Sequence, residues 1–271
     1  MPAEKLPAID TETQDLAIQR IVDEPVQFSA WQRTGITLIL ILVTLIWGST
    51  FLVVQHTIRL VGPFTFLTIR FGIGALALTL IYPRRLARLR RYELLSGSLL
   101  GVILFAAFAL QTTGLQYTST SMAGFITGLY VPFVPLFSIV LLRQWPKTGT
   151  TLGIVLSFLG LTLLSVNDHF TLTLGLGELL ILGCAVANAL HIVSISKFAP
   201  RADAINLSIV QIAITALLSL MCMPLAHEPF VLPPLPVWGS GLFMGVLATA
   251  FCLAVMNRVQ QFVSSVRATL V

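Results

Sequence analysis

Three pairs of polar or aromatic side chains occur at helical spacing within otherwise apolar stretches of the chain. The pairs are Trp47 with Thr50, Thr127 with Tyr130, and Asn188 with His191. Residues that are three positions apart lie on one face of an α-helix. We therefore expect the three pairs to line one central cavity of mixed aromatic and polar character. Such a cavity suits small zwitterionic or amphipathic molecules better than inorganic ions.

Arg70 and Gln211 are the other polar side chains within apolar stretches that could contact a ligand. Arg70 lies about 10 Å below the predicted outer end of its helix, at about 1.5 Å per residue. Its guanidinium could bind an anionic group such as a carboxylate, or it could donate to backbone carbonyls or extend toward the interface. The candidate substrate-binding residues are Trp47, Thr50, Arg70, Thr127, Tyr130, Asn188, His191 and Gln211.

Structural roles are alternatives for several of these residues. Trp47 and Tyr130 could serve packing or interfacial anchoring. His191 could be a neutral histidine with satisfied hydrogen bonds, or it could be a switch that responds to protonation. Glu178 falls in the first turn of a predicted helix, so we expect it to stabilise the helix N-terminus rather than couple an ion.

Enzymatic chemistry has little support in the sequence. The four histidines are scattered, and neither an HExxH motif nor paired carboxylates occur in it. A phosphate-binding loop is also missing from the sequence, so this chain would not itself use ATP. We predict no catalytic residues, no metal site and no cofactor. Cys184, Cys222 and Cys252 fall in apolar runs and are interpreted as small apolar side chains.

The composition indicates that lipid surrounds most of the chain. Of its 271 residues, 56% are hydrophobic and 10% are charged, whereas about a quarter are charged in an ordinary soluble domain. So few charges cannot cover the surface of a water-soluble protein. Soluble enzymes, nucleic-acid binders and disordered scaffolds are therefore excluded. Residues 1–34 are polar and acidic, and we expect them to form a cytoplasmic tail.

The remaining chain predicts an all-α, polytopic membrane bundle. The apolar runs are about 17–22 residues long, which fits spanning helices and not barrel strands of about ten residues. Helices are expected at 36–56, 64–82, 94–112, 121–142, 151–167, 177–196, 204–224 and 238–257, with a ninth from about 262.

Loop charges predict the orientation of this bundle. The basic residues cluster in the even-numbered connections: Arg84, Arg85, Arg88, Arg90, Arg91, Arg143, Lys147, Lys197, Arg201 and Arg258. Basic loops remain in the cytoplasm. We therefore expect a multi-pass protein of the plasma membrane with a cytoplasmic N-terminus.

The two halves of the chain can be aligned on each other. A shift of 141 places Trp47 on Asn188 and Arg70 on Gln211, and a shift of 144 places Gly97-x-x-x-Gly101 on Gly241-x-x-x-Gly245. Glycines four apart, which also occur at positions 124 and 128, permit close helix approach in lipid. A unit with an odd number of helices that is repeated in tandem must insert upside down the second time, so the alignment predicts two inverted five-helix repeats, at residues 35–167 and 175–271. The second repeat would be incomplete, and about 40 residues would be missing from it.

The motifs resemble those of the drug/metabolite transporter superfamily, in particular the EamA family. The matching segments are Trp47-Gly48-Ser49-Thr50-Phe51, Arg70-Phe71, Gly114-Leu115-Gln116-Tyr117-Thr118-Ser119, Pro132, Gly177-Glu178, Asn188-Ala189-Leu190-His191 and Gln211. The chain departs from the family pattern at Arg143-Gln144, where Gly-Glu is common, and at Asn188, where an aromatic residue is expected. The resemblance implies a ten-helix transporter of small metabolites or drugs.

We therefore predict a secondary transporter that works by alternating access and exports small metabolites such as amino acids or drug-like compounds. The alternatives are an intramembrane enzyme and a membrane assembly partner that does not transport. The expected partners are a small-molecule substrate and membrane lipids, with no nucleic acid, and a homodimer is a further possibility.

Overall fold

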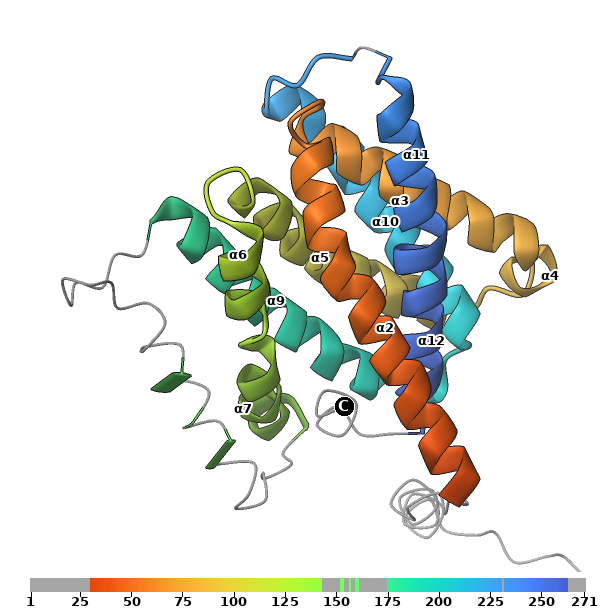
Figure 1. The fold of residues 1–271 in the computed structure, drawn as a ribbon. Coiled ribbons are helices and arrows are strands. Elements are labelled where there is room, and N and C mark those ends of the chain that lie inside the picture. The colour runs from red at the N-terminus through yellow and green to blue at the C-terminus, as the bar shows by residue number, and fades with distance from the viewer. Residues whose placement is uncertain are drawn as a thin grey trace, which may run out of the picture. The chain divides into compact units, whose positions relative to one another are not determined.

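The computed structural model describes residues 30–142, 152–153, 156, 159–160, 175–230 and 232–262. These residues form helices joined by turns, and no strand occurs among them (Figure 1). Seven of the helical stretches are long and apolar enough to cross a membrane. The prediction of an all-α polytopic bundle is confirmed. Met1–Ile36 and Thr37–Val271 form two units, and the packing described below lies within the second.

The helices begin and end close to the positions expected from hydropathy. They are α2 (Ala30–Thr57), α3 (Pro63–Ile81), α4 (Pro83–Leu86), α5 (Arg91–Gly114), α6 (Thr120–Thr127), α7 (Tyr130–Leu142), α9 (Leu176–Phe198), a 3-10 turn (Ala199–Arg201), α10 (Ala204–Leu225), α11 (Leu235–Phe243), a π-helical segment (Met244–Phe251) and α12 (Cys252–Val259). The predicted helices at 151–167 and from 262 fall largely or wholly outside the described residues.

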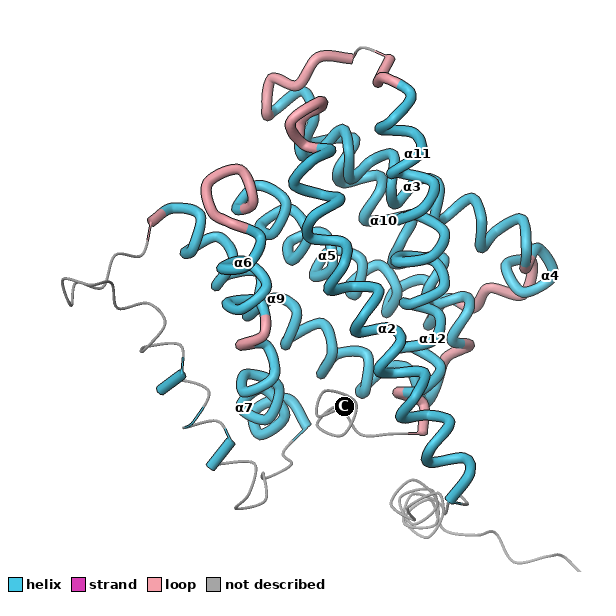
Figure 2. The backbone as a smooth tube through the Cα atoms, in the orientation of Figure 1, coloured by secondary structure: helices cyan, strands magenta, loops and turns pink. Residues whose placement is uncertain are grey.

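The fourth predicted helix is not continuous, which corrects the expectation for 121–142. It is divided into α6 and α7 at Gly128 and Leu129, where Figure 2 shows a short stretch in the loop colour. Pro132 lacks the N–H that would donate to the carbonyl of Gly128. Val131 donates to that carbonyl instead, at 3.1 Å. The missing donor explains why the helix is interrupted one turn before the proline.

The eighth predicted helix also departs from a regular α-helix. Its middle turns, Met244–Phe251, are π-helical and lie between α11 and α12. Hydrogen bonds in a π-helix span five residues, so the side chains and carbonyls rotate away from their α-helical positions. The segment packs against α3, and two of its residues contact the cavity helices as described below.

Helices α3, α5, α9 and α10 pack closely, and glycines permit one contact among them and one between α3 and the π-helical segment. A Cβ added at Gly101 would lie 2.9 Å from the carbonyl oxygen of Gln211 and 2.7 Å from Cβ of Ile214. A Cβ added at Gly245 would lie 2.6 Å from the carbonyl oxygen of Arg70 and 3.1 Å from Cβ of Ile73. These two glycines therefore allow α5 to approach α10 and the π-helical segment to approach α3.

The third glycine pair does not pack helices together, so that expectation is wrong. An added Cβ at Gly124 would meet nothing within 4 Å, and the nearest atom to one at Gly128 is the carbonyl oxygen of Phe125, in the preceding turn of the chain. Both glycines instead line a cavity.

Two carboxylates connect the two ends of α10 to neighbouring helices, Glu93 to α5 and Glu228 to α3. Glu93, which is 3% exposed, accepts from the backbone N–H groups of Arg90 and Asp203 and from the side-chain amide of Asn206, at 2.8–3.0 Å. Asp203 also forms an ion pair with Arg85 at 2.6 Å. We call this group the Glu93 junction.

The second carboxylate lies where α10 ends and α3 begins. Glu228 accepts from the backbone N–H of Phe64 at 3.0 Å and from the N–H and hydroxyl of Thr65 at 2.7 Å. A Cβ at Gly62 would lie 2.0 Å from Cδ of Glu228, so only glycine fits there. We call this group the Glu228 junction.

Candidate functional site

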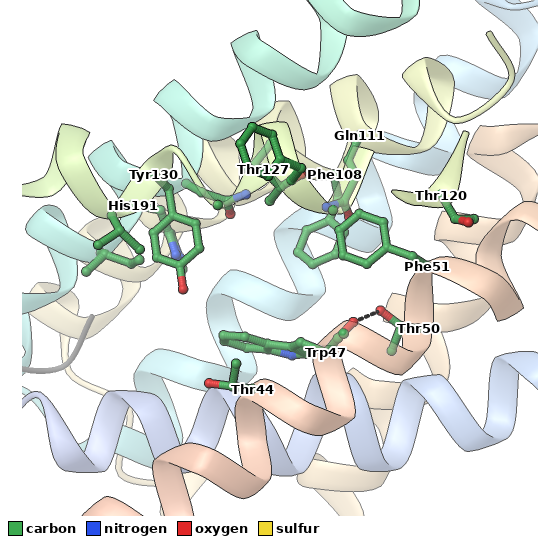
Figure 3. A pocket seen from close by; sticks show the side chains of 18 of the residues that line it. Thr44, Trp47, Thr50, Phe51, Phe108, Gln111, Thr120, Thr127, Tyr130 and His191 are labelled. Atoms are coloured by element: carbon green, nitrogen blue, oxygen red, sulfur yellow. Dashed lines mark hydrogen bonds between the residues drawn. The ribbon is translucent and has the colours of Figure 1, made fainter. Parts of the chain in front are cut away.

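A cavity of about 580 Å³ lies between the N-terminal and C-terminal halves of the bundle. Its lining comes from α2, α3, α5, α6, α7, α9 and α12, so residues far apart in the sequence meet around it (Figure 3). Seven of the eight predicted residues line it, namely Trp47, Thr50, Arg70, Thr127, Tyr130, Asn188 and His191. That they bind a substrate stays a prediction.

Trp47 is held in place by the π-helical segment. Its indole Nε1 donates to the carbonyl oxygen of Ala248, in the π-helical segment, at 2.8 Å. In Figure 3 the ring lies flat along one side of the cavity, across from Tyr130. The indole therefore presents its face to the cavity while its polar edge is satisfied by protein.

Arg70 is almost fully enclosed, at 1% exposure. Its Nε donates to the hydroxyl of Thr249 at 2.9 Å. The guanidinium carbon lies 4.7 Å from the ring centre of Phe108 and 5.4 Å from that of Phe71. Neither expected structural role, donation to backbone carbonyls or extension to the interface, describes this arrangement. The charge is instead supported by a hydroxyl and two aromatic rings next to the cavity.

His191 and Gln211 form a buried pair. Nε2 of His191 lies 2.8 Å from Oε1 of Gln211, and the two residues are 4% and 0% exposed. Because an amide oxygen can only accept, Nε2 carries the proton in this arrangement. Gln211 thus lies behind His191 and outside the cavity lining, and the geometry favours the histidine with a satisfied hydrogen bond.

The other predicted residues differ in how far their polar groups are already engaged. The hydroxyl of Thr50 donates to the carbonyl oxygen of Trp47 in its own helix at 2.6 Å. Nδ2 of Asn188 lies 3.2 Å from Sγ of Cys184. In Figure 3 the hydroxyl of Tyr130 points into the cavity. Tyr130 therefore offers a donor to the cavity, whereas Thr50 and Asn188 are partly used within their own helices.

Sequence reasoning missed three residues that shape this site. Phe108 and Gln111, three apart on α5, line the cavity, and Thr249 positions Arg70. The spacing of Phe108 and Gln111 matches the rule that identified the other pairs and could have found them. Only the path of the π-helical segment brings Thr249 to Arg70.

The cavity has basic side chains but no carboxylate in its described lining. Its described lining contains Arg70 and His191 but neither Asp nor Glu. Within the described residues, no group of three His, Cys, Asp or Glu side chains could hold a metal ion. Glu178 lies outside the lining and accepts from the hydroxyl of Thr118, so it ties α9 to the connection before α6.

Comparison with known proteins places the chain in a family. Residues 33–166 match the EamA-like transporter family, and similar curated proteins are named as transporters. Over these residues the chain belongs to the EamA-like transporter family. This membership and the seven apolar helices identify a multi-pass membrane protein.

The related EamA-like proteins are similar over part of their length. An uncharacterized transporter of Archaeoglobus fulgidus is 35% identical over 159 residues, which are 59% of this chain and 48% of that protein. The uncharacterized transporter YvbV of Bacillus subtilis is 29% identical over 189 residues, which are 67% of this chain and 60% of that protein. The chain thus spans about half to three fifths of the length of these relatives.

The fold also occurs in a solved structure. One crystal structure matches with a TM-score of 0.67 and 21% sequence identity, over 88% of this chain and 83% of that chain. At this identity the likeness supports the fold of the EamA-like bundle and carries no information about the ligand.

Proposed function

We propose that the protein is a secondary transporter that exports small amphipathic metabolites by alternating access. The observation that carries the proposal is the cavity between the two halves, lined by side chains from seven helices. Ligand sites in transporters commonly lie between repeats near the middle of the membrane. The aromatic faces of Trp47, Phe108 and Tyr130 would hold the apolar part of the substrate. The polar groups would fix its orientation.

Alternating access requires two units that can move against each other, and we propose residues 35–167 and 175–271 as these units. The glycine contacts support an inverted repeat. Under the shift of 144, Gly101 corresponds to Gly245, and under the shift of 141, Arg70 and Ile73 correspond to Gln211 and Ile214. Each glycine therefore packs on the equivalent turn of the other unit, as a twofold relation between the units requires.

The proposed location is the plasma membrane, with the N-terminus in the cytoplasm. The exposed arginines of the connection between α3 and α5 support this orientation, because short basic loops remain on the cytoplasmic side. A cysteine introduced in place of Arg88 should react with an impermeant reagent only after cells are permeabilised. Labelling of intact cells would contradict the orientation.

The central test fills the cavity without disturbing the helix contacts. An added Cβ at Gly124 would meet nothing within 4 Å, so Gly124→Leu should fold while its side chain occupies the ligand space. The matched control is Gly72→Leu, because Gly72 also has nothing within 4 Å of an added Cβ but is not among the cavity residues. We expect flux in proteoliposomes to fall about tenfold or more with Gly124→Leu and to persist with Gly72→Leu. Equal flux in both variants would contradict a transport role for this cavity.

A further inference from the structure

We infer that the cavity selects small organic anions, a carboxylate on an aromatic or aliphatic body, and discriminates against organic cations. The inference rests on the proposed function, because it names the substrate class of the same site. Its basis is the imbalance of charge and of hydrogen-bond donors around the cavity.

The first observation is that Arg70 has no anionic partner among the residues that the structure describes. Only its Nε is engaged, by the hydroxyl of Thr249 at 2.9 Å, and no carboxylate within the described residues pairs with the guanidinium. A buried charge without a counter-ion is costly, since the protein replaces its hydration only partly. A ligand carboxylate would supply the missing charge and accept from the terminal nitrogens, which are suited to bidentate binding of a planar anion.

The second observation is that the described lining of the cavity offers a cation no carboxylate. None of its described lining residues is Asp or Glu. The ring of Phe108, which could receive a ligand ammonium, already has the guanidinium of Arg70 at 4.7 Å. An organic cation would therefore be repelled by Arg70 and would find no carboxylate in compensation. The ammonium of a zwitterion would meet the same difficulty.

The third observation concerns the neutral groups around the cavity. The hydroxyl of Tyr130 points into it (Figure 3) and makes no hydrogen bond within the described residues. The side-chain amide of Gln111 also lines it, again without a partner in that part of the chain. Both can donate to carboxylate oxygens. The aromatic residues Trp47 and Phe51 line the remaining space and suit an apolar body.

The test uses three probes of one shape that differ in charge: 3-phenylpropanoate, 3-phenylpropanamide and 3-phenylpropan-1-amine. Their binding to the full chain in lipid nanodiscs is measured by isothermal titration calorimetry. We expect the carboxylate to bind about 10- to 100-fold more tightly than the amide, the range expected for charge-assisted hydrogen bonds. The amine should bind more weakly than the amide.

Variants of the protein test whether Arg70 supplies the selectivity. Arg70→Gln should remove the preference for the carboxylate over the amide while amide binding persists, which also shows that the variant is folded. If Arg70→Gln binds none of the probes, Arg70→Lys, which keeps the charge, should retain the preference for the carboxylate over the amide. Arg59→Gln is the matched control, because Arg59 is exposed and lies outside the cavity. It should leave all three affinities unchanged.

The outcomes separate this inference from the proposed function. Equal binding of the three probes, or tighter binding of the amine, would overturn the anion preference and leave the cavity as a ligand site. A carboxylate preference that survives in Arg70→Gln would also overturn it, because another group would then supply the selectivity. Binding that Gly124→Leu does not reduce would place the ligand elsewhere and overturn the proposed site itself.

Discussion

The N-termini of α3 and α10 both have backbone N–H groups without a partner in their own helix, but these groups obtain their hydrogen-bond acceptors from different places. At α10, Asp203 accepts from the N–H groups of Ile205 and Asn206, at 3.0 and 3.2 Å. Asp203 is itself the N-cap residue, so this helix is capped by its own chain segment.

At α3 the N-cap residue is Gly62, which has no side chain to accept a hydrogen bond. The shift of 141 that relates the halves places Gly62 on Asp203. The equivalent N–H groups, those of Phe64 and Thr65, donate to Glu228, which follows the C-terminal end of α10. The capping carboxylate of α3 therefore comes from the segment that follows α10 and not from the start of α3 itself.

The difference shows how one local requirement can stabilise either a helix or a contact between helices. A cap from within the segment stabilises the start of α10 whether or not α3 is docked. A cap from Glu228 exists only while the two helices are together, so it also stabilises their contact. At the other end of α10, Asp203 already caps the helix, and Glu93 in the first turn of α5 supplies a separate connection between α5 and α10.

Removal of the Glu93 carboxylate should have the largest effect. Glu93→Ala would leave two backbone N–H groups and the amide of Asn206 without their acceptor in a buried place. The expected loss of stability is at least about 3 kcal/mol, because three hydrogen bonds to a charged group are lost and each contributes about 1.5–3 kcal/mol. It should appear as a lower midpoint in thermal unfolding of the detergent-solubilised protein. Glu93→Gln keeps the shape and one acceptor, so its midpoint should lie between those of the unchanged protein and Glu93→Ala. An unchanged midpoint in Glu93→Ala would contradict the role of the Glu93 junction.

An exchange of the capping arrangement tests the comparison directly. Glu228→Ala should cost about 2 kcal/mol by leaving the start of α3 uncapped. Gly62→Asp alone should also destabilise, since its Cβ would lie 2.0 Å from Cδ of Glu228. In the double variant the clash is absent and Asp at position 62 can cap α3 as Asp203 caps α10. We expect its unfolding midpoint to exceed that of both single variants, and additive losses would refute the exchange.

The smallest effect is expected at Arg85. Its ion pair with Asp203 is short, at 2.6 Å, but the arginine side chain is 61% exposed. Exposed ion pairs contribute about 0–1 kcal/mol and weaken with salt. Arg85→Ala should therefore shift the unfolding midpoint much less than Glu93→Ala, and the shift should vanish at high salt. A loss as large as that of Glu93→Ala would mean that the ion pair, and not the buried carboxylate, holds this end together.

The sequence by itself determined the spanning helices. Long apolar runs demand a lipid solvent, and in lipid a helix satisfies its own backbone hydrogen bonds, so hydropathy predicts α3, α5, α9 and α10 to within a few residues. Spacing by three residues identified six of the residues that line the cavity, because helical periodicity decides which side chains share a face. Of the glycine pairs, those in α5 and in α11 with the π-helical segment pack helices as expected.

The tertiary structure alone decided the contacts between distant segments. The acceptor of the Trp47 indole is 201 positions away in Ala248, and the partner of Arg70 Nε is 179 positions away in Thr249. Neither follows from local pattern, because a π-helical segment has the same composition as an α-helix and differs only in hydrogen-bond register. The caps of α3 and α10 show the same difference between local and distant contacts. Asp203 can be recognised beside the helix that it caps, whereas Glu228 reaches α3 only because α3 and α10 pack antiparallel.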